Sequence, residues 1–396
     1  MVLEAYKKIR NNGKAAGVDG VSIEDFGQDL NGNLYKLWNR MTSGCYHPQQ
    51  MREKKIAKSN GKTRSLNIPC VADRIAQSVV KTYLERKVEP TFHDDSYGYR
   101  PKRHAHQAIN KATQRCFKHS WIIDMDIESF FDTIDHELMM KAVQRYTEEK
   151  WVLMYIERWL KSGVVKEDGK LSNREEGSGQ GSVISPLLSN IFLHFVFDKW
   201  MEKNYPRVPF ERYCDDIIVH CKSKAQALYM QFLISERLKA CKLKLNQEKT
   251  RIVFCKNPNN KGMENHQHVS FNFLGYTFKP TLQPTKNGLL LLTTPSMSTQ
   301  SKKRVREKIK ELKIKQAPGK IHQLAKVINE RTRGWINYYC EFGKWATVDL
   351  WRGLNWRLLK WAMNRRTWGM RRAVRWLKSI YETRPGLFIH WAIARP

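Results

Sequence analysis

No hydrophobic run in this sequence is long enough to cross a bilayer, which requires about 20 consecutive apolar residues. The best candidate, residues 183–197, is interrupted by serine, proline, asparagine and histidine. The first residues, Met1-Val2-Leu3-Glu4, lack the basic and apolar segments of a secretory signal peptide. The sequence therefore predicts no membrane span. The lack of a signal-peptide pattern favours a cytoplasmic location.

Paired cysteines are also missing. The sequence has 8 cysteines, but no two of them form a C-x-x-C pair. Such pairs are typical of zinc sites, and regularly spaced cysteines are typical of disulfide-linked secreted domains. The sequence therefore predicts neither a zinc site nor a disulfide framework, and its thiols are expected to be reduced.

Acidic residues are scarce relative to basic ones. The 396 residues include 70 Lys and Arg but only 38 Asp and Glu, which gives a formal net charge of +32. Residues 301–396 alone hold 24 basic and 6 acidic residues, a net charge of +18. An excess of this size predicts a polyanionic partner, and nucleic acid is the expected one.

The same C-terminal quarter is rich in tryptophan, with 8 of the 13 tryptophans of the chain. Basic side chains interleaved with aromatic ones suit a surface that follows a phosphate backbone and stacks bases. The alternative is a helical core filled by tryptophan, with solvated charges outside it. We expect both arrangements, with Trp335, Trp351 and Trp356 in the core.

Two adjacent carboxylates stand between two β-prone segments. Residues 213–216 read Tyr-Cys-Asp-Asp, with an apolar pair before them and Ile217-Ile218-Val219 after them. This pattern predicts a β-hairpin with Asp215 and Asp216 at its tip. An ordinary turn is the alternative, because Asp is common in turns. If divalent cations bind there, the pair suits the joining of a 3′-hydroxyl to an α-phosphate.

A second acidic strand is predicted at residues 121–128. Alternation with a period of two places its apolar side chains on one face and three acids on the other: Asp124, Asp126 and Glu128. Acids in such positions are usually solvated, as we expect for Asp124, Glu128, Asp132 and Asp135 unless Asp135 caps the following helix. Asp126 is selected as the partner of the hairpin by the motifs that follow.

Further short motifs occur in a fixed order along the chain. They are Ser-Leu-Asn-Ile-Pro at 65–69 with Asp-Arg at 73–74, Tyr-Gly-Tyr-Arg-Pro at 97–101, Asp-Ile-Glu-Ser-Phe-Phe at 126–131, Gln-Gly-Ser-Val-Ile-Ser-Pro-Leu-Leu-Ser-Asn at 180–190, Leu-Asn-Gln-Glu-Lys-Thr at 245–250 and Phe-Leu-Gly-Tyr at 273–276. With the tetrad at 213–216, this collinear set resembles the reverse transcriptase of bacterial group II introns and its close relatives.

The resemblance implies an α/β right-hand polymerase with fingers, an antiparallel-sheet palm and an all-helical thumb. The expected ranges are 1–95 for the fingers with a short N-terminal extension and a template-covering loop, 96–295 for the palm, 296–364 for the thumb or maturase domain, and 365–396 for a short basic DNA-binding region. No endonuclease module is expected. The local pattern predicts helices over 223–243, 298–315, 321–339 and 348–364, and a hairpin turn at Asn287-Gly288.

The resemblance also assigns a metal site. Asp126, Asp215 and Asp216, with the backbone carbonyl of Ile127, would hold two Mg²⁺ ions, with Mn²⁺ as a substitute. Magnesium prefers hard oxygen ligands and completes its coordination with water and substrate phosphates.

A nucleotide site is implied next to the metals. Arg64 and Arg74 would grip the incoming triphosphate, since guanidinium groups match phosphate oxygens. Phe131 falls at the position that excludes a 2′-hydroxyl, Gln180 lies on a glycine-flanked loop, and Lys249 would neutralise or protonate the leaving pyrophosphate. The alternatives are a core position for Phe131 and a solvated turn position for Lys249.

The sequence departs from the family pattern at two positions. Gly179 stands where proline is usual, so the loop of Gln180 is expected to be more flexible. Cys214 stands where alanine is usual in the tetrad, and catalysis should tolerate this small residue.

Nucleic-acid contacts are expected from all regions of the chain. The candidates are Lys14, Arg100, Arg331, Arg333, Tyr338, Arg371, Arg372 and Arg375.

The resemblance implies an RNA-directed DNA polymerase in the bacterial cytoplasm, associated with the nucleoid. Its partners would be an RNA template, a DNA or RNA primer, deoxynucleoside triphosphates and the parent group II intron RNA, whose splicing and retrohoming it would assist. Two alternatives stay open: a domesticated relative acting in DNA repair or phage defence, and a splicing factor that no longer polymerises. The oligomeric state is left open.

Overall fold

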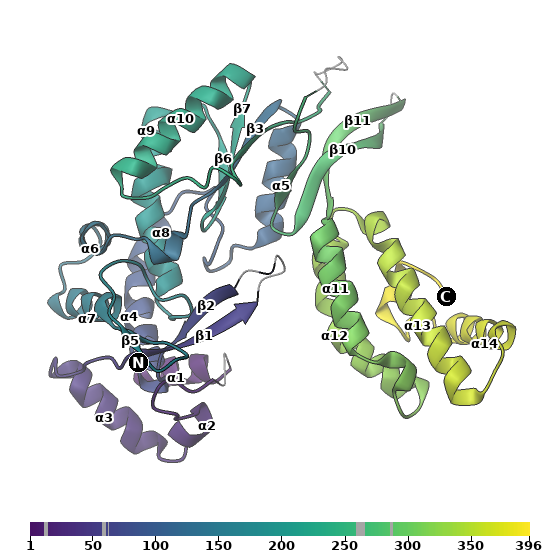
Figure 1. Cartoon of the computed structure of the whole chain (residues 1–396), viewed down its shortest axis with the longest axis horizontal. Coiled ribbons are helices and arrows are strands. Elements are labelled where there is room, and N and C mark those ends of the chain that lie inside the picture. Colours follow the sequence, from purple (N-terminus) through teal and green to yellow (C-terminus); the bar gives the residue numbers. More distant parts are fainter. Residues whose placement is uncertain (12–14, 58–60, 62, 259–265, 286–287) are drawn as a thin grey trace. The chain divides into compact units, whose positions relative to one another are not determined.

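The computed structural model describes residues 1–11, 15–57, 61, 63–258, 266–285 and 288–396. These residues form two compact units, shown with their elements in Figure 1. The first unit contains residues 1–108 and 121–252, and the second contains residues 109–120 and 253–396. The predicted fingers and most of the predicted palm thus share one unit, and the fourfold division of the chain stays a prediction.

The first unit is built from helices packed on two small sheets. Its helices are α1 (Val2–Arg10), α2 (Ile23–Phe26), α3 (Leu30–Thr42), α4 (Val71–Val88), α6 (His136–Gln144), α7 (Lys150–Lys161), α8 (Ser185–Leu193), α9 (Lys199–Asn204) and α10 (Lys224–Ala240), and α5 (Ala105–Cys116) crosses the boundary between the units. One continuous cluster of buried apolar side chains joins the N-terminal helices to the central strands.

The N-terminal sheet begins with a hairpin of β1 (Met51–Ala57) and β2 (Thr63–Ile68). Two short strands, β4 (Val164–Val165) and β5 (Leu171–Ser172), extend it in the order β2-β1-β4-β5. Most residues of β1 and the first half of β2 are exposed. This hairpin therefore offers polar side chains to solvent, and Arg64 is one of them.

The central sheet carries the acidic residues. Its order is β6-β7-β3-β8, with the strands β6 (Phe210–Tyr213), β7 (Asp216–Cys221), β3 (Trp121–Asp126) and β8 (Arg251–Phe254). The hairpin predicted at residues 213–216 is confirmed, because β6 and β7 pair antiparallel with Tyr213 opposite Asp216. Cys214, in the two-residue loop, adopts a left-handed φ of 59°.

The alternation predicted for β3 is only partly present. Ile123 and Met125 are buried as expected, but Ile122 on the acidic face is fully buried as well. Asp124, predicted to be solvated, is half-buried. Both faces of this strand are covered, as is common for the middle of a sheet.

The helix predicted behind the hairpin is present as α10. The Ser223 hydroxyl accepts a hydrogen bond from the backbone N–H of Gln226, which caps the helix as expected. Ala227, Met230 and Ile234 are buried along one stripe. The helix ends at Ala240 rather than continuing to residue 243.

The second unit joins a three-stranded sheet to a helical bundle. The sheet order is β11-β10-β9, with the strands β9 (Phe271–Phe273), β10 (Tyr276–Thr285) and β11 (Gly288–Met297). The strands flank the predicted turn at Asn287-Gly288, and Thr285 pairs with Gly288, but residue 287 lies outside the described residues. The helices are α11 (Thr299–Glu311), α12 (Ile321–Tyr339), α13 (Val348–Arg366) and α14 (Met370–Thr383).

The helical bundle has its own apolar core. Trp351 is fully buried in this core, as predicted. Trp335 is half-buried and packs against the core, whereas Trp356 is 46% exposed, so the core prediction for Trp356 was wrong. Among the described residues, no helix combines the length and apolar character needed to span a membrane.

Candidate active site

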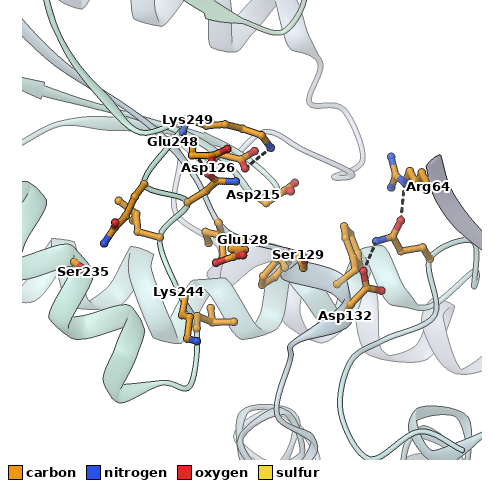
Figure 2. Close-up of a pocket in the computed structure, with 18 of the residues that line it drawn as sticks. Arg64, Asp126, Glu128, Ser129, Asp132, Asp215, Ser235, Lys244, Glu248 and Lys249 are labelled. Carbon is orange, nitrogen blue, oxygen red and sulfur yellow. Dashed lines mark hydrogen bonds and ion pairs between the residues drawn. The ribbon is translucent and has the colours of Figure 1, made fainter. Parts of the chain in front are cut away.

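A pocket of about 1010 Å³ opens in the first unit, where the ends of the central strands meet the β1–β2 hairpin (Figure 2). It brings together most of the residues predicted to bind metal and nucleotide, although they are far apart in the sequence: Arg64, Asp126, Ile127, Phe131, Gln180, Asp215 and Lys249.

The carboxylates predicted to be catalytic lie on two neighbouring strands and in the loop before one of them. Asp126 ends β3, and Asp215 lies in the loop between β6 and β7. Asp216 begins β7 directly opposite Asp126. Paired residues of an antiparallel ladder point to the same face, so the register brings the side chains of Asp126 and Asp216 close together. Asp126 and Asp215 both line the pocket.

The two pocket carboxylates repel each other. Burial raises the pKa of Asp215 above its ordinary value, and the negative charge of Asp126 raises this pKa further. Arg64 acts in the opposite direction but does not cancel the effect. A cation placed between the two carboxylates would favour their ionised forms.

One cation of the chain already contacts Asp126. Lys249 Nζ lies 2.7 Å from Asp126 Oδ2. The turn that carries Lys249 is fixed against β3, because the backbone N–H of Asn246 donates to the Asp126 carbonyl at 2.8 Å. Lys249 therefore neutralises a carboxylate here, whereas the sequence predicts that it meets the leaving pyrophosphate.

The donor set of this pocket fits a magnesium ion. Asp126 and Asp215 supply hard carboxylate oxygens, and the ammonium of Lys249 shows that a positive charge is accommodated beside them. Among the described residues, no group of three or more His, Cys, Asp or Glu is arranged to hold a metal ion. Magnesium often takes only one or two carboxylates and completes its shell with water and substrate phosphates.

A chain of hydrogen bonds forms the opposite wall of the pocket. Arg64 Nε donates to Gln180 Oε1 at 2.6 Å, and Gln180 Nε2 donates to Asp132 Oδ2 at 3.4 Å (Figure 2). Arg64 is exposed, and one of its guanidinium donors, Nε–H, is used in the hydrogen bond to Gln180. Arg64 itself lines the pocket.

The loop of Gln180 is tied to the β1–β2 hairpin. The backbone N–H of Asn67 donates to the Gln180 carbonyl at 2.6 Å. Gly181 has a φ of +113°, and a Cβ there would lie 2.7 Å from the Asn67 carbonyl oxygen. A Cβ on Gly179 would lie 2.9 Å from Met51 Sδ. Close backbone approach and the positive φ thus explain Gly181, whereas a Cβ on Gly179 would meet only side-chain atoms.

Phe131 belongs to both the core and the pocket. Its side chain is 8% exposed, and its ring packs edge-on against Phe130 with centroids 5.3 Å apart. Phe131 also lines the pocket, on the 3₁₀ turn Phe130–Asp132 that comes after β3 in the chain. The sequence leaves two alternatives for Phe131, a position at the nucleotide pocket or a position in the core. These alternatives are therefore compatible.

A buried ion pair that the sequence analysis missed supports the hairpin. Arg212, fully buried on β6, donates from Nε and one terminal nitrogen to the two oxygens of Asp198 at 2.7 and 2.6 Å. Its third nitrogen donates to Asn190 Oδ1 at 3.0 Å and to the Cys214 carbonyl at 3.4 Å. Burial opposes ionisation of Asp198, yet Arg212 holds the pKa of this carboxyl below its usual value.

The tyrosine-glycine motif packs directly beneath the same hairpin. Asn190 Nδ2 donates to the Gly98 carbonyl at 2.7 Å, and a Cβ on Gly98 would lie 2.6 Å from the Cys214 nitrogen. Cys214 is buried, and burial raises the pKa of its thiol to about 12. The Cys214 thiol therefore acts as a small side chain that packs in the protein interior.

The predictions for two other acidic residues, Asp124 and Asp135, have different outcomes in the structure. Burial raises the pKa of Asp124 to about 7, and nearby Asp126 raises it too, while Arg251 opposes the shift. The prediction that Asp124 is solvated was therefore wrong. Asp135 caps α6 as expected, since Leu138 N–H donates to its carboxylate at 2.9 Å.

Two predicted contacts lie away from the pocket. Arg74 is buried, and its guanidinium donates to the carbonyls of Pro69 and Ala15. Arg100 is buried and pairs with Glu89 at 2.9 Å. In both cases the arginine donates to backbone carbonyls of its own chain, and neither side chain lines the pocket, so their assignment to ligand binding stays a prediction. Lys14 lies outside the described residues.

The remaining nucleic-acid candidates belong to the second unit. The Tyr338 hydroxyl donates to the Leu274 carbonyl at 2.8 Å, so this half-buried side chain fixes the chain before β10, and its contact with a duplex stays a prediction. The five arginines among these candidates are exposed: Arg331 and Arg333 on α12, and Arg371, Arg372 and Arg375 on α14. Arg372 also stacks over Trp368, with its guanidinium carbon 4.8 Å from the ring centroid.

Comparison with known proteins is informative for both units. Residues 56–278 match the family model described as reverse transcriptase (RNA-dependent DNA polymerase). Residues 302–379 match the maturase-specific domain of group II introns.

Individual relatives agree with these matches. Protein YkfC of Escherichia coli (strain K12) is 34% identical over 298 residues, which is 66% of this chain and 74% of that protein. The group II intron-encoded protein LtrA of Lactococcus lactis subsp. cremoris is 32% identical over 194 residues, or 48% of this chain and 32% of LtrA. The putative COX1/OXI3 intron 1 protein of Saccharomyces cerevisiae is 29% identical over 202 residues, 51% of this chain and 24% of that protein. The match thus spans a third or less of the two intron-encoded relatives.

Proposed function

Because the chain belongs to the reverse transcriptase family of RNA-dependent DNA polymerases, with a group II intron maturase-specific domain, we propose that its pocket extends a primer on an RNA template. Deoxynucleoside triphosphates are the proposed substrates, and two Mg²⁺ ions the proposed cofactors. The observation that carries this proposal is the common pocket of Asp126, at the end of β3, and Asp215, in the loop between β6 and β7.

Asp126 and Asp215 would hold the ions, with Asp216 and the Ile127 carbonyl as further ligands. Bound divalent ions supply two effects in this chemistry: they activate the attacking 3′-hydroxyl and neutralise charge on the leaving pyrophosphate. The protein contributes by fixing the carboxylates. The Arg212–Asp198 pair beneath the hairpin holds the loop that carries Asp215.

Arg64 would bind the triphosphate at the opposite wall. Gln180 holds its Nε, which leaves the terminal nitrogens of the guanidinium for phosphate oxygens. Phe131, packed against Phe130 at the pocket wall, would exclude a 2′-hydroxyl because its ring cannot move far. These contacts would orient the nucleotide before the bond forms.

We further propose that the second unit binds group II intron RNA and assists splicing and retrohoming. The support is the maturase-specific segment at residues 302–379 and the net charge of +18 over residues 301–396. A positive surface of this kind binds the phosphate backbone with a strong dependence on salt.

Primer extension on an RNA template tests the catalytic proposal. Asp126→Asn and Asp215→Asn should each lower the rate by a factor of about 1000 or more, because each removes a ligand charge at the reacting phosphate. RNA affinity should change by no more than a few fold. Asp168→Asn, in an exposed turn outside the pocket, is the control. Near-normal extension by Asp215→Asn would refute the metal assignment, whereas no extension even by the unaltered protein would favour a splicing factor without polymerase activity.

A further inference from the structure

Trp356 has an exposed side chain although it lies on a helix that packs against the apolar core. The residue lies on α13, whose other face forms the core of the second unit. Its side chain is 46% exposed, while Trp351 and Trp361 on the same helix are buried. Trp356 thus presents part of its aromatic ring to solvent beside a well-formed apolar core.

The ring lines a small pocket of about 220 Å³ between α13 and α14. Trp356 and Leu359 contribute from α13, and Val374 and Leu377 contribute from α14. Leu359 and Leu377 are buried, so the floor of the pocket is part of the apolar core. The pocket therefore combines an apolar floor with an exposed aromatic wall.

Positive charges surround this pocket. Arg352, one helical turn before Trp356, and Arg395, near the end of the chain, both line it, and both are exposed. Lys360 Nζ lies 5.2 Å from the Trp356 ring centroid, a cation–π contact that holds the ring. Two cations line this aromatic pocket and a third contacts its tryptophan ring, which favours a ligand with a flat apolar part and negative charge.

The pocket wall is fixed rather than loose. Asn355, buried next to Trp356, donates from Nδ2 to the carbonyls of Ala394 and Arg395 at 2.9 and 3.1 Å. Its Oδ1 accepts a hydrogen bond from Trp391 Nε1 at 2.9 Å. The segment that carries Arg395 is thereby attached to α13, and the pocket exists before any ligand arrives.

We propose that this pocket binds one unpaired nucleotide of a single-stranded nucleic acid. The base would stack on the Trp356 indole, and the adjoining phosphates would pair with Arg352 and Arg395. A base within a duplex cannot enter, because its faces are covered by neighbouring base pairs, whereas unpaired bases commonly stack on aromatic side chains. The proposal rests on the nucleic-acid binding proposed above and adds a subsite that selects unpaired strands.

Binding of three fluorescent probes tests this subsite: a short unstructured RNA, a DNA of the same sequence and the corresponding RNA duplex. Trp356→Ala should weaken binding of the single strands about tenfold, since stacking on one aromatic ring accounts for that much. Binding of the duplex should not change. Trp356→Phe should retain most of the affinity. If only the RNA strand is affected, the ligand is RNA; if both strands are, the subsite accepts either sugar.

Salt dependence separates stacking from charge. Trp356→Ala should leave the slope of log affinity against log salt unchanged, while Arg352→Gln with Arg395→Gln should reduce it by up to about one unit per lost phosphate contact. Trp345→Ala, which removes a side chain 80% exposed outside this pocket, is the matched control. Thermal unfolding of each variant shows whether its fold is retained.

Three results would overturn the subsite: unchanged single-strand affinity in folded Trp356→Ala, an equal loss for the duplex, or an equal loss in Trp345→Ala. If the unaltered protein binds none of the probes, the proposed nucleic-acid function fails together with the subsite. Loss of single-strand binding with normal primer extension would leave the polymerase proposal intact.

Discussion

Lys249 forms an ion pair with the carboxylate of Asp126, with 2.7 Å between Nζ and Oδ2. The lysine belongs to the turn before β8, and the aspartate ends β3. In polymerisation the same carboxylate is proposed to bind a divalent ion, so the ammonium and the ion compete for one oxygen. This competition has a measurable consequence.

Lys249→Gln should bind Mn²⁺ more tightly than the unaltered protein in the absence of nucleotide. The ion pair is partly exposed, and such pairs contribute up to about 1 kcal/mol, which corresponds to about a fivefold lower dissociation constant. Electron paramagnetic resonance, which detects free Mn²⁺, measures the dissociation constant of each protein.

Lys242→Gln is the matched control for that experiment. Lys242 is 61% exposed, like Lys249, and pairs with Asp135 at 2.6 Å outside the pocket. Its replacement should leave Mn²⁺ affinity unchanged. Equal affinities in all three proteins would mean that the ammonium does not compete with the ion. Absence of binding even in the unaltered protein would count against the metal site itself.

Phe131→Ala should allow ribonucleotides to be incorporated. Removing the ring opens the pocket wall next to the nucleotide sugar, so the preference for deoxynucleotides should fall by at least about tenfold. Because Phe131 is largely buried, the variant should also lose about 3 kcal/mol of stability. Relative incorporation of the two nucleotide types, measured below the unfolding temperature, checks the prediction.

Phe92→Ala supplies the comparison for this loss of stability. Phe92 is buried to a similar degree but does not line the pocket. The Phe92→Ala variant should be less stable than the unaltered protein, without any change in its preference for deoxynucleotides. Unaltered selectivity in Phe131→Ala would assign the ring to the core alone.

His390 should make the second unit sensitive to acid. The imidazole is fully buried, with Nε2 2.8 Å from Asn355 Oδ1, and burial lowers its pKa from 6.5 to about 3. Between these values the unfolded chain binds a proton that the folded chain does not, so stability falls as the pH decreases from 6.5 towards 3. At pH 5 this single group should cost about 2 kcal/mol relative to pH 7.

Urea unfolding of the full chain at several pH values, with His390→Gln as the comparison, isolates this contribution. The difference in unfolding free energy between the two proteins should change with pH below about 6.5 and be constant above it. A difference that is independent of pH would show that His390 takes up its proton without unfolding.

Arginines on α14 should contribute to the salt dependence of nucleic-acid binding. Replacing Arg371, Arg372 and Arg375 by Gln should reduce the slope of log affinity against log salt, by up to about one unit per lost phosphate contact. Fluorescence anisotropy with one RNA over a range of salt concentrations measures the slope. Replacing three exposed lysines of the first unit gives the charge-matched control: Lys161, Lys166 and Lys170. The same decrease in both sets would indicate a general effect of net charge.

The local patterns of the sequence were sufficient for many elements. The helix predicted over 321–339 is α12 with the same bounds, and Ser223 caps α10. The acidic hairpin and its partner strand are also where the pattern places them. Helix periodicity, capping and turn preference depend on residues close together in the chain, which is why a sequence alone reveals them.

Only the tertiary structure decided which partners the long charged side chains have. Arg74 and Arg100 stand in motifs that resemble ligand contacts, yet both are buried against their own backbone. Lys249 meets Asp126, and Trp356 remains in solvent although its helix is otherwise well packed. The reason is physical: a guanidinium or ammonium on a flexible stem can reach several groups, and folding determines which of them lies within reach.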